Sequence, residues 1–139
     1  GNGGSFADSQ HLSAEFTSRF MFDRASLPSL ALGTNSSSMS AIANDYGYEF
    51  VFSRELESIS HENDVVVAIS TSGNSKNILN VVDECRARKI CVWGFTGKAG
   101  GALAKKTKCI KAPSDDTAIE FSSSCLIVSN FITRIPLAI

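Results

Sequence analysis

The stretch DVVVAISTSGNSKNILNVVDECRARKICVWGFTG, residues 64–97, decides the fold class. Residues 65–69 form a continuous, mostly β-branched run, which is typical of a strand buried on both faces in a parallel sheet. Residues 75–89 have the apolar spacing of a helix, and a second apolar run follows at residues 90–97. The apolar stripe of the helix consists of Ile78, Val81, Val82 and Cys85. A strand, a helix and a second strand in this order predict a parallel βαβ unit.

The rest of the chain continues this alternation. Helices are expected at residues 10–20, on both sides of a break near residues 44–48, at 101–107 and at 117–135, and strands at 26–33 and 108–114. The pattern predicts one α/β domain over residues 1–139, a three-layer sandwich whose mostly parallel sheet is flanked by helices. No strand precedes the glycine-rich start, so we expect the N-terminal helices and the first strand of the domain to be lacking and the sheet to be weaker for it. The end of the chain, with Pro136 in a β-branched stretch, is atypical for a final helix.

Composition excludes several classes of partner. The 139 residues carry a net charge of about −1, with 13 basic and 14 acidic side chains, so no basic field indicates nucleic acid. No apolar run approaches the roughly 18 residues of a membrane-spanning helix, so no membrane partner is expected. The four cysteines match no zinc-binding spacing, and we interpret them as buried free thiols in a reducing cytoplasm.

Two loops rich in short polar residues point to a ligand. The segment STSGNS, residues 70–75, joins the buried strand to a helix, where backbone N–H groups are unpaired and partly positive. Its hydroxyl donors are Ser70, Thr71, Ser72 and Ser75, and Gly73 allows close backbone approach. These features favour a phosphate held by neutral donors, although hydroxyls at this position also serve simply to cap a helix. The segment GNGGS, residues 1–5, has the same character, and two such loops predict one ligand held from two sides.

Two further polar pairs are candidates for chemistry. His11 and Glu15 lie four residues apart, hence on one side of a helix, where they can share a metal, divide acid–base work or form a plain surface pair. Asn44 and Asp45 lie at the predicted helix break, where a simple turn explains them equally well. The other histidine, His61, precedes the buried strand and is interpreted as a surface residue.

Five motifs in order carry a resemblance to a known family. They are GNGGSFADSQHLSAEF, AIANDYGYEFVFSRELE, AISTSGNSKNIL, GFTGKAGGALA and APSDDTA. Over about residues 1–118 the chain resembles a sugar isomerase (SIS) domain, and within that family the phosphoheptose isomerases. The resemblance implies interconversion of sedoheptulose 7-phosphate and D-glycero-D-manno-heptose 7-phosphate for lipopolysaccharide or other surface glycans. It also implies a cytoplasmic homotetramer with active sites built between subunits.

The resemblance also implies roles for individual residues. Substrate contacts would fall on Asn2, Gly3, Gly4, Ser5, Asn44, Asp45, Ser70, Thr71, Ser72 and Ser75. Glu15 would be the base that moves a proton between C1 and C2 through an enediol. His11 and Glu15 would share a zinc ion.

The chain departs from the family pattern near its end. The family has a catalytic histidine and a glutamine on its last helix, and these positions fall here on Ser124 or Ser129 and on Phe121. Serine is a poor general acid near neutral pH, and phenylalanine binds no metal. We therefore expect impaired turnover, and the alternative function is an SIS protein that only binds a sugar phosphate or a protein partner such as the replication initiator.

Overall fold

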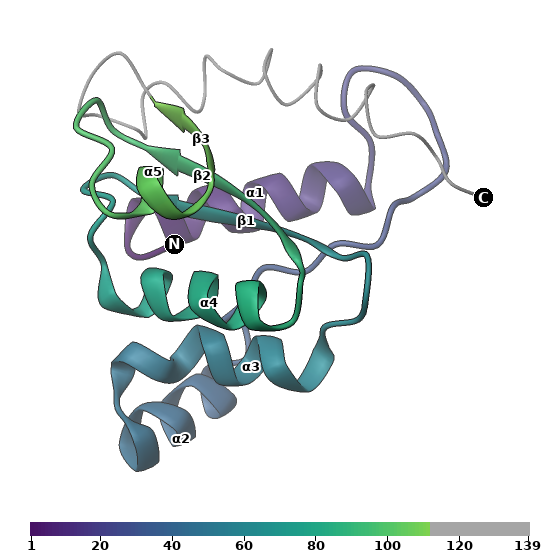
Figure 1. Ribbon diagram of the computed structural model, residues 1–139. Helices are drawn as coiled ribbons and strands as arrows, with labels where there is room; N and C mark the ends of the chain where they lie inside the picture. The colour runs from purple at the N-terminus through teal and green to yellow at the C-terminus, as the bar shows by residue number, and fades with distance from the viewer. Residues whose placement is uncertain (112–139) are drawn as a thin grey trace.

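The computed structural model describes residues 1–111, in which a run of helices precedes short parallel strands that alternate with further helices (Figure 1). The helices are α1 (Gly4–Thr17), α2 (Ser36–Tyr46), the 3-10 helix η1 (Tyr48–Phe50), α3 (Val51–Ile59), α4 (Lys76–Ala87) and α5 (Leu103–Lys106). The strands are β1 (Val65–Ser70), β2 (Cys91–Thr96) and β3 (Lys108–Lys111). The predicted βαβ unit is confirmed as β1, α4 and β2.

The sheet has the order β1-β2-β3, and both strand pairs are parallel. Ser70 at the end of β1 is in register with Thr96 at the end of β2. The loops that follow these two strands therefore leave the sheet at the same edge, which is where open parallel sheets bind ligands. The predicted α/β class with a parallel sheet flanked by helices is confirmed.

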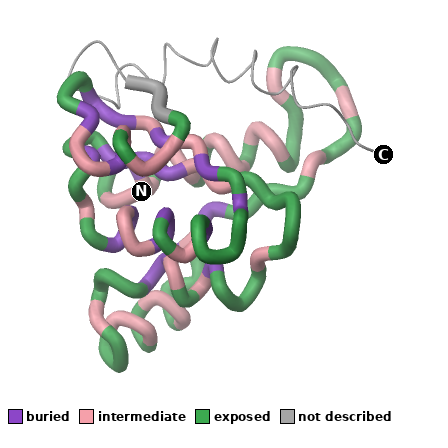
Figure 2. Tube along the Cα trace, viewed as in Figure 1, coloured by how far each residue is buried: buried purple, intermediate pink, exposed green. Residues whose placement is uncertain are grey.

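The core lies between the sheet and two stacked helices. In Figure 1, α4 lies next to the sheet, α3 packs on α4, and α2 is outermost, while α1 contacts β1. Buried residues concentrate on the strands and on the facing sides of α3 and α4 (Figure 2). Phe52, Ile69, Ile78, Val82 and Leu103 are at most 2% exposed. The predicted stripe of α4 is buried in full, and each such aliphatic side chain contributes about 1.5–3 kcal/mol by leaving water.

Local capping explains where α2 begins and ends. The side chain of Asn35 accepts a hydrogen bond from the backbone N–H of Ser38 at 3.1 Å, which satisfies one free donor of the first turn. Gly47 has a φ of 102°, a conformation that other residues rarely adopt, and the helix stops there. The predicted break near residues 44–48 is therefore confirmed.

The strand predicted at residues 26–33 is wrong. These residues form no strand, and their backbone is held from elsewhere: Leu27 N–H donates to the Phe16 carbonyl and Gly33 N–H to the Glu55 carboxylate. Leu30 is 58% exposed, whereas Ala31 and Gly33 are buried, so the run is only partly buried. Within residues 1–111 no strand pairs with it, and an apolar run without ladder partners does not become a strand.

Three other predictions need adjustment. The first helix begins at Gly4 rather than residue 10 and ends before Phe20. Cys85 is buried as expected, whereas Cys91 is exposed because it opens β2 on the outward-facing phase of that strand. The helix predicted at 117–135 lies outside the described residues.

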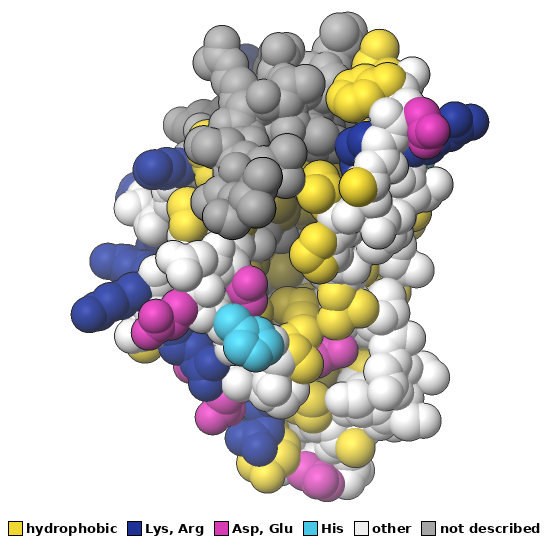
Figure 3. Space-filling view, turned by 90° about the vertical axis from the view of Figure 1, so that its right-hand side faces the viewer, with side chains coloured by type: hydrophobic (Ala, Val, Ile, Leu, Met, Phe, Trp, Pro, Cys, Tyr) yellow, Lys and Arg dark blue, Asp and Glu magenta, His cyan; other side chains and the backbone are white. Residues whose placement is uncertain are grey.

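The surface contains apolar side chains at the end of the molecule opposite the ligand edge. Val65, which opens β1, is 46% exposed. Figure 3 shows hydrophobic side chains gathered in the middle of the face that lies at the right of Figure 1, between polar borders. Within residues 1–111, no helix has both the length and the apolar character needed to cross a membrane.

Candidate active site

The loop after β1 is closed by the loop after β2. Gly97 N–H donates to the Thr71 carbonyl at 3.0 Å, and Leu103 N–H donates to the Gly73 carbonyl at 2.9 Å. The side chain of Asn74 accepts from Ala102 N–H at 3.0 Å. Residues 70–75 and 97–103 thus form one compact edge, because each loop supplies the backbone partners of the other.

The hydroxyl groups of residues 70–75 do not cap α4. Ser75 is the N-cap of α4, yet its side chain makes no capping hydrogen bond; it receives one from the buried Ser70 hydroxyl at 3.2 Å. The Ser72 hydroxyl accepts from Asn74 N–H at 3.1 Å within the loop. Simple helix capping is therefore the weaker explanation for Ser75. The start of α4 keeps its partial positive charge directed at this loop, which is the arrangement that holds anions.

The GNGGS loop lies beside this edge. The side-chain amides of Asn2 and Asn77 exchange two hydrogen bonds, of 2.9 Å from Asn2 Nδ2 and 2.8 Å from Asn77 Nδ2. Asn77 is in the first turn of α4, and Asn2 directly precedes Gly3, the N-cap residue of α1. The structure therefore brings the N-termini of both helices together, as expected if two loops hold one ligand. Gly3 adopts a φ of 53° at this turn, and Ser5 is buried.

Asn77 belongs to this region although the motifs of the sequence did not indicate it. It lies two residues after the hydroxyl-rich loop and next to Ile78 on the buried side of α4. The Asn77 residue is only 3% exposed. A polar residue on an otherwise apolar stripe was the available signal, because buried amides require specific partners. Tyr48 was missed as well, and its hydroxyl donates to Asn2 Oδ1 at 3.2 Å.

His11 and Glu15 form the predicted pair on α1. His11 Nε2 lies 3.1 Å from Glu15 Oε1, with side-chain exposures of 68% and 24%. His11 lies near the middle of α1 and Glu15 near its C-terminal end, and the helix runs away from the loop edge (Figure 1). At about 1.5 Å rise per residue, Glu15 is ~15 Å along the helix from Ser5. Within one chain, the structure does not bring this pair to the loops.

A second acidic residue, Asp8, lies on the same helix. Burial raises the pKa of the Asp8 carboxyl, and the neighbouring charge of His11 partly opposes that rise. Asp8 Oδ2 is buried without a hydrogen-bond partner among the described residues. No group of three or more metal-ligating side chains occurs within residues 1–111. An imidazole and a carboxylate are ligand types that zinc accepts, and His11 and Glu15 are in contact. Together they supply two of the four ligands of a tetrahedral zinc site.

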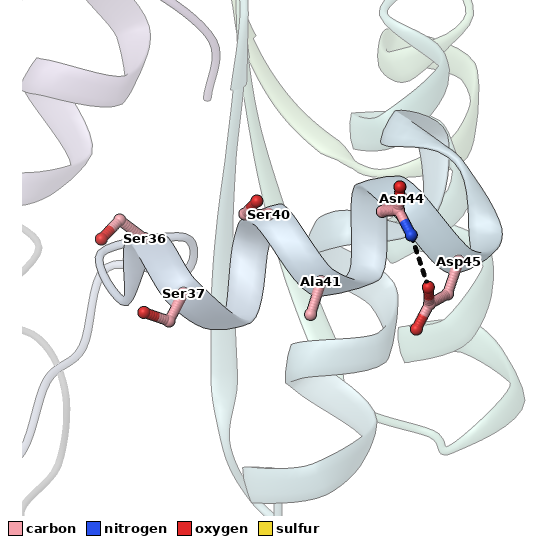
Figure 4. Close-up of a pocket in the computed structure, with 6 residues that line it drawn as sticks. All are labelled: Ser36, Ser37, Ser40, Ala41, Asn44 and Asp45. Atoms are coloured by element: carbon pink, nitrogen blue, oxygen red, sulfur yellow. Dashed lines mark hydrogen bonds between the residues drawn. The ribbon is translucent and has the colours of Figure 1, made fainter.

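Asn44 and Asp45 are both exposed near the C-terminal end of α2. Asn44 Nδ2 donates to Asp45 Oδ1 at 2.8 Å. They line a shallow surface cavity of about 590 Å³ along α2 (Figure 4). Its lining residues are Ser36, Ser37, Ser40, Ala41, Asn44 and Asp45. Asn44 and Asp45 hydrogen-bond to each other here, and the link from this part of the chain to the loop edge is made by Tyr48.

The remaining residues discussed from the sequence are His61 and three positions near the C-terminus. His61 is exposed in the turn before β1, as interpreted. The positions of the family's histidine and glutamine, Phe121, Ser124 and Ser129, lie outside the described residues.

A second groove, of about 340 Å³, runs between α1 and α2 with Phe6, Met39 and Tyr48 among its lining residues.

Comparisons with known proteins agree with this geometry. Residues 1–97 match the sequence profile of the SIS domain. The chain is 48% identical to "Phosphoheptose isomerase" of Aneurinibacillus thermoaerophilus over 133 residues, covering 95% of this chain and 67% of that protein. It is 49% identical to "Phosphoheptose isomerase 2" of Campylobacter jejuni subsp. jejuni over 118 residues, covering 84% of this chain and 59% of that protein.

Solved structures give the same result. A phosphoheptose isomerase from Francisella tularensis superposes with a TM-score of 0.82 at 32% identity, covering 92% of this chain and 69% of that one. Another, from Neisseria gonorrhoeae, superposes with a TM-score of 0.78 at 36% identity, covering 94% of this chain and 70% of that one. The chain thus spans about 59–70% of the length of these relatives. Taken with the parallel sheet and the two converging loops, these matches show that the chain belongs to the SIS domain family and, within it, to the phosphoheptose isomerases.

Proposed function

We propose that this chain interconverts sedoheptulose 7-phosphate and D-glycero-D-manno-heptose 7-phosphate. The observation that carries the proposal is the convergence of residues 1–5 and 70–75 at the N-termini of α1 and α4. Neutral hydroxyl and backbone N–H donors at a helix N-terminus suit a phosphate dianion. The relatives are named phosphoheptose isomerases, which supports a heptose phosphate as the substrate.

The phosphate end of the substrate would bind at the hydroxyl-rich loop. Ser72 and Thr71 are exposed at the carboxyl edge of β1, and Ser75 is half-buried beside them. The substrate contacts proposed here are Asn2, Gly3, Gly4, Ser5, Asn44, Asp45, Ser70, Thr71, Ser72 and Ser75. An internal hydroxyl pair such as Ser70 and Ser75 can turn its donors toward an anion without a change of backbone.

Glu15 would act as the base. Its carboxylate takes a proton from C1 of the ketose, the C1–C2 bond becomes the double bond of the enediol, and the carbonyl oxygen gains a proton. Return of the proton to C2 and loss of the proton from the C1 hydroxyl, which balances the proton gained by the C2 oxygen, give the aldose, so no redox partner is needed. His11 and Glu15 would hold a zinc ion, whose chemistry is to polarise the substrate's oxygen atoms.

The distance between Glu15 and the loop edge supports a shared active site. In one chain they are separated by ~15 Å along α1. The carbonyl and the phosphate of a heptose 7-phosphate lie at opposite ends of the sugar, and a second copy would bring its own Glu15 toward the first copy's loops. This separation supports a homo-oligomer, the tetramer implied by the resemblance. The product would serve lipopolysaccharide or other surface glycans in the cytoplasm.

An isomerisation assay tests the proposal. Sedoheptulose 7-phosphate is incubated with the 139-residue chain, with and without added zinc, and both sugars are quantified by NMR. We expect slow turnover that Glu15→Gln abolishes, and weaker binding of the sugar phosphate in Ser72→Ala. Binding without turnover in the wild-type chain would favour the alternative of a binding protein, and absence of binding would overturn the proposal.

A further inference from the structure

The amide pair of Asn2 and Asn77 joins two parts of the chain that are remote in sequence. Two hydrogen bonds of 2.9 and 2.8 Å connect them across 75 residues. Asn77 is 3% exposed and sits in the first turn of α4, directly behind the hydroxyl-rich loop. A buried amide that satisfies its partner in both directions is a rigid contact, because either amide alone would be left unpaired at a cost of about 1–3 kcal/mol.

The donors and acceptors of Asn2 are almost all accounted for. Its Oδ1 accepts from Asn77 Nδ2 and from the Tyr48 hydroxyl, so both oxygen lone pairs are used. One of its two Nδ2 hydrogens goes to Asn77 Oδ1. A rotation of the amide by half a turn would oppose oxygen to oxygen and nitrogen to nitrogen in this pair. The remaining polar capacity of the Asn2 side chain is therefore one N–H donor.

We propose that Asn77 and Tyr48 are positioning residues that hold Asn2 as a hydrogen-bond donor toward an oxygen of the sugar phosphate. The inference rests on the proposed function and adds two residues to it. Tyr48 comes from η1, Asn77 from α4 and Asn2 from the turn before α1, so three separate segments meet at one amide. Their contact sets the spacing between the two loops that are proposed to grip one ligand.

The chain offers a matched control on the same helix. Asn80 lies one turn after Asn77 and donates from Nδ2 to the Glu49 carbonyl at 2.9 Å. It joins α4 to η1, and no hydrogen bond connects it to Asn2. Replacement of either asparagine by aspartate removes one side-chain amide donor of α4, and only the change at position 77 removes a hydrogen bond to Asn2.

Affinity for sedoheptulose 7-phosphate, measured by calorimetry on the full 139-residue chain, tests the inference. We expect Asn77→Asp to weaken binding about tenfold or more, the equivalent of losing one buried hydrogen bond. Tyr48→Phe, which deletes only an exposed hydroxyl, should weaken it about two- to threefold, and Asn80→Asp should stay within about twofold of wild type. Melting curves of each variant report folding separately.

A second measurement separates positioning from a general structural effect. When the new carboxyl group of Asn77→Asp is protonated at lower pH, its O–H can replace the lost N–H donor to Asn2. The affinity ratio of wild type to Asn77→Asp should therefore shrink as the pH falls, whereas the ratio for Asn80→Asp should stay constant.

The failures are distinguishable. Equal affinities of wild type and Asn77→Asp, or equal losses in Asn77→Asp and Asn80→Asp, overturn this inference and leave the proposed function standing. If Asn77→Asp does not fold, an unchanged affinity of Tyr48→Phe overturns it. A wild-type chain that binds no sugar phosphate overturns the proposed function, and this inference with it.

Discussion

Gly73 and Gly100 are in such close contact that a β-carbon on Gly73 would overlap the Gly100 carbonyl oxygen. Gly73 has a φ of 66°, and Gly100 has a φ of 75°. The loop after β1 and the loop after β2 thus interlock through backbone alone. The carboxyl edge of the sheet depends on this contact, because it holds the hydroxyl-rich loop in place.

We therefore expect Gly73→Ala to lower the free energy of unfolding by about 2–3 kcal/mol, combining the cost of a left-handed backbone with the overlap. Urea unfolding followed by circular dichroism measures the change. Gly4→Ala is the matched control, because Gly4 has no heavy atom within 4 Å of its added β-carbon and lies in a helix. That variant should equal or exceed the wild type in stability, and a Gly73→Ala variant as stable as Gly4→Ala would show that the loops do not interlock.

Glu15→Gln should remove turnover while leaving substrate affinity within a few-fold of wild type. The amide keeps the size of the carboxylate but accepts no proton, and loss of a general base typically costs about 10²–10⁴-fold in rate. Single-turnover kinetics and calorimetry measure the two effects separately. Glu57→Gln, an exposed change on α3, is the control and should retain full activity. Unchanged turnover in Glu15→Gln would assign the base to another residue.

Arg24→Ala should destabilise the end of α1. The guanidinium of Arg24 donates to the carbonyls of Glu15 and Phe16 at 2.6 and 3.0 Å, so a cation occupies the negative end of the helix. We expect a loss of about 1–2 kcal/mol, seen as a melting temperature lower by about 5 °C. Arg19→Ala, at an exposed position just beyond the helix, should melt as the wild type does. Equal melting of both variants would contradict a capping role for Arg24.

Cys85 should resist alkylation far better than Cys91. Burial, followed by the nearby charge of Glu84, raises the pKa of the Cys85 thiol to about 12, whereas Cys91 is exposed. Only the thiolate reacts, so at pH 8 iodoacetamide should label Cys91 at least about 100-fold faster, measured on the separate peptides by mass spectrometry. Comparable rates for the two thiols in the folded chain would show that Cys85 is not buried.

The raised pKa of the Cys85 thiol predicts the direction in which the stability of the fold changes with pH. Its ordinary pKa of 9.0 in the unfolded chain lies below the folded value of about 12. Between these values the unfolded state releases a proton that the folded state keeps, so stability falls as the pH rises above about 9. Cys85→Ala should show less of this decline in denaturant titrations at pH 8 and pH 10. An identical decline in both proteins would assign it to other groups.

Part of the site could be predicted from the sequence because its residues are close neighbours along the chain. The hydroxyls at Ser70 to Ser75 follow a β-branched run, and His11 and Glu15 are one helical turn apart, so the chain itself keeps each group together. The distance between these groups in the folded chain could not be predicted in this way. The distance of ~15 Å along α1 between Ser5 and Glu15 follows from where the helix begins, at Gly4, which the apolar spacing did not reveal.

What the sequence determined by itself was the α/β class, the parallel strands and the identity of the loop residues, because periodicity of 2 and 3.6 residues and strand-to-helix order are local properties. The tertiary structure alone decided which remote residues meet: Asn2 with Asn77, Gly73 with Gly100, and Arg24 with the end of α1. It also decided that residues 26–33 remain irregular although their composition favours a strand. The physical reason is common to all of these: a hydrogen bond or close contact needs a partner, and a partner far along the chain is supplied only by the fold.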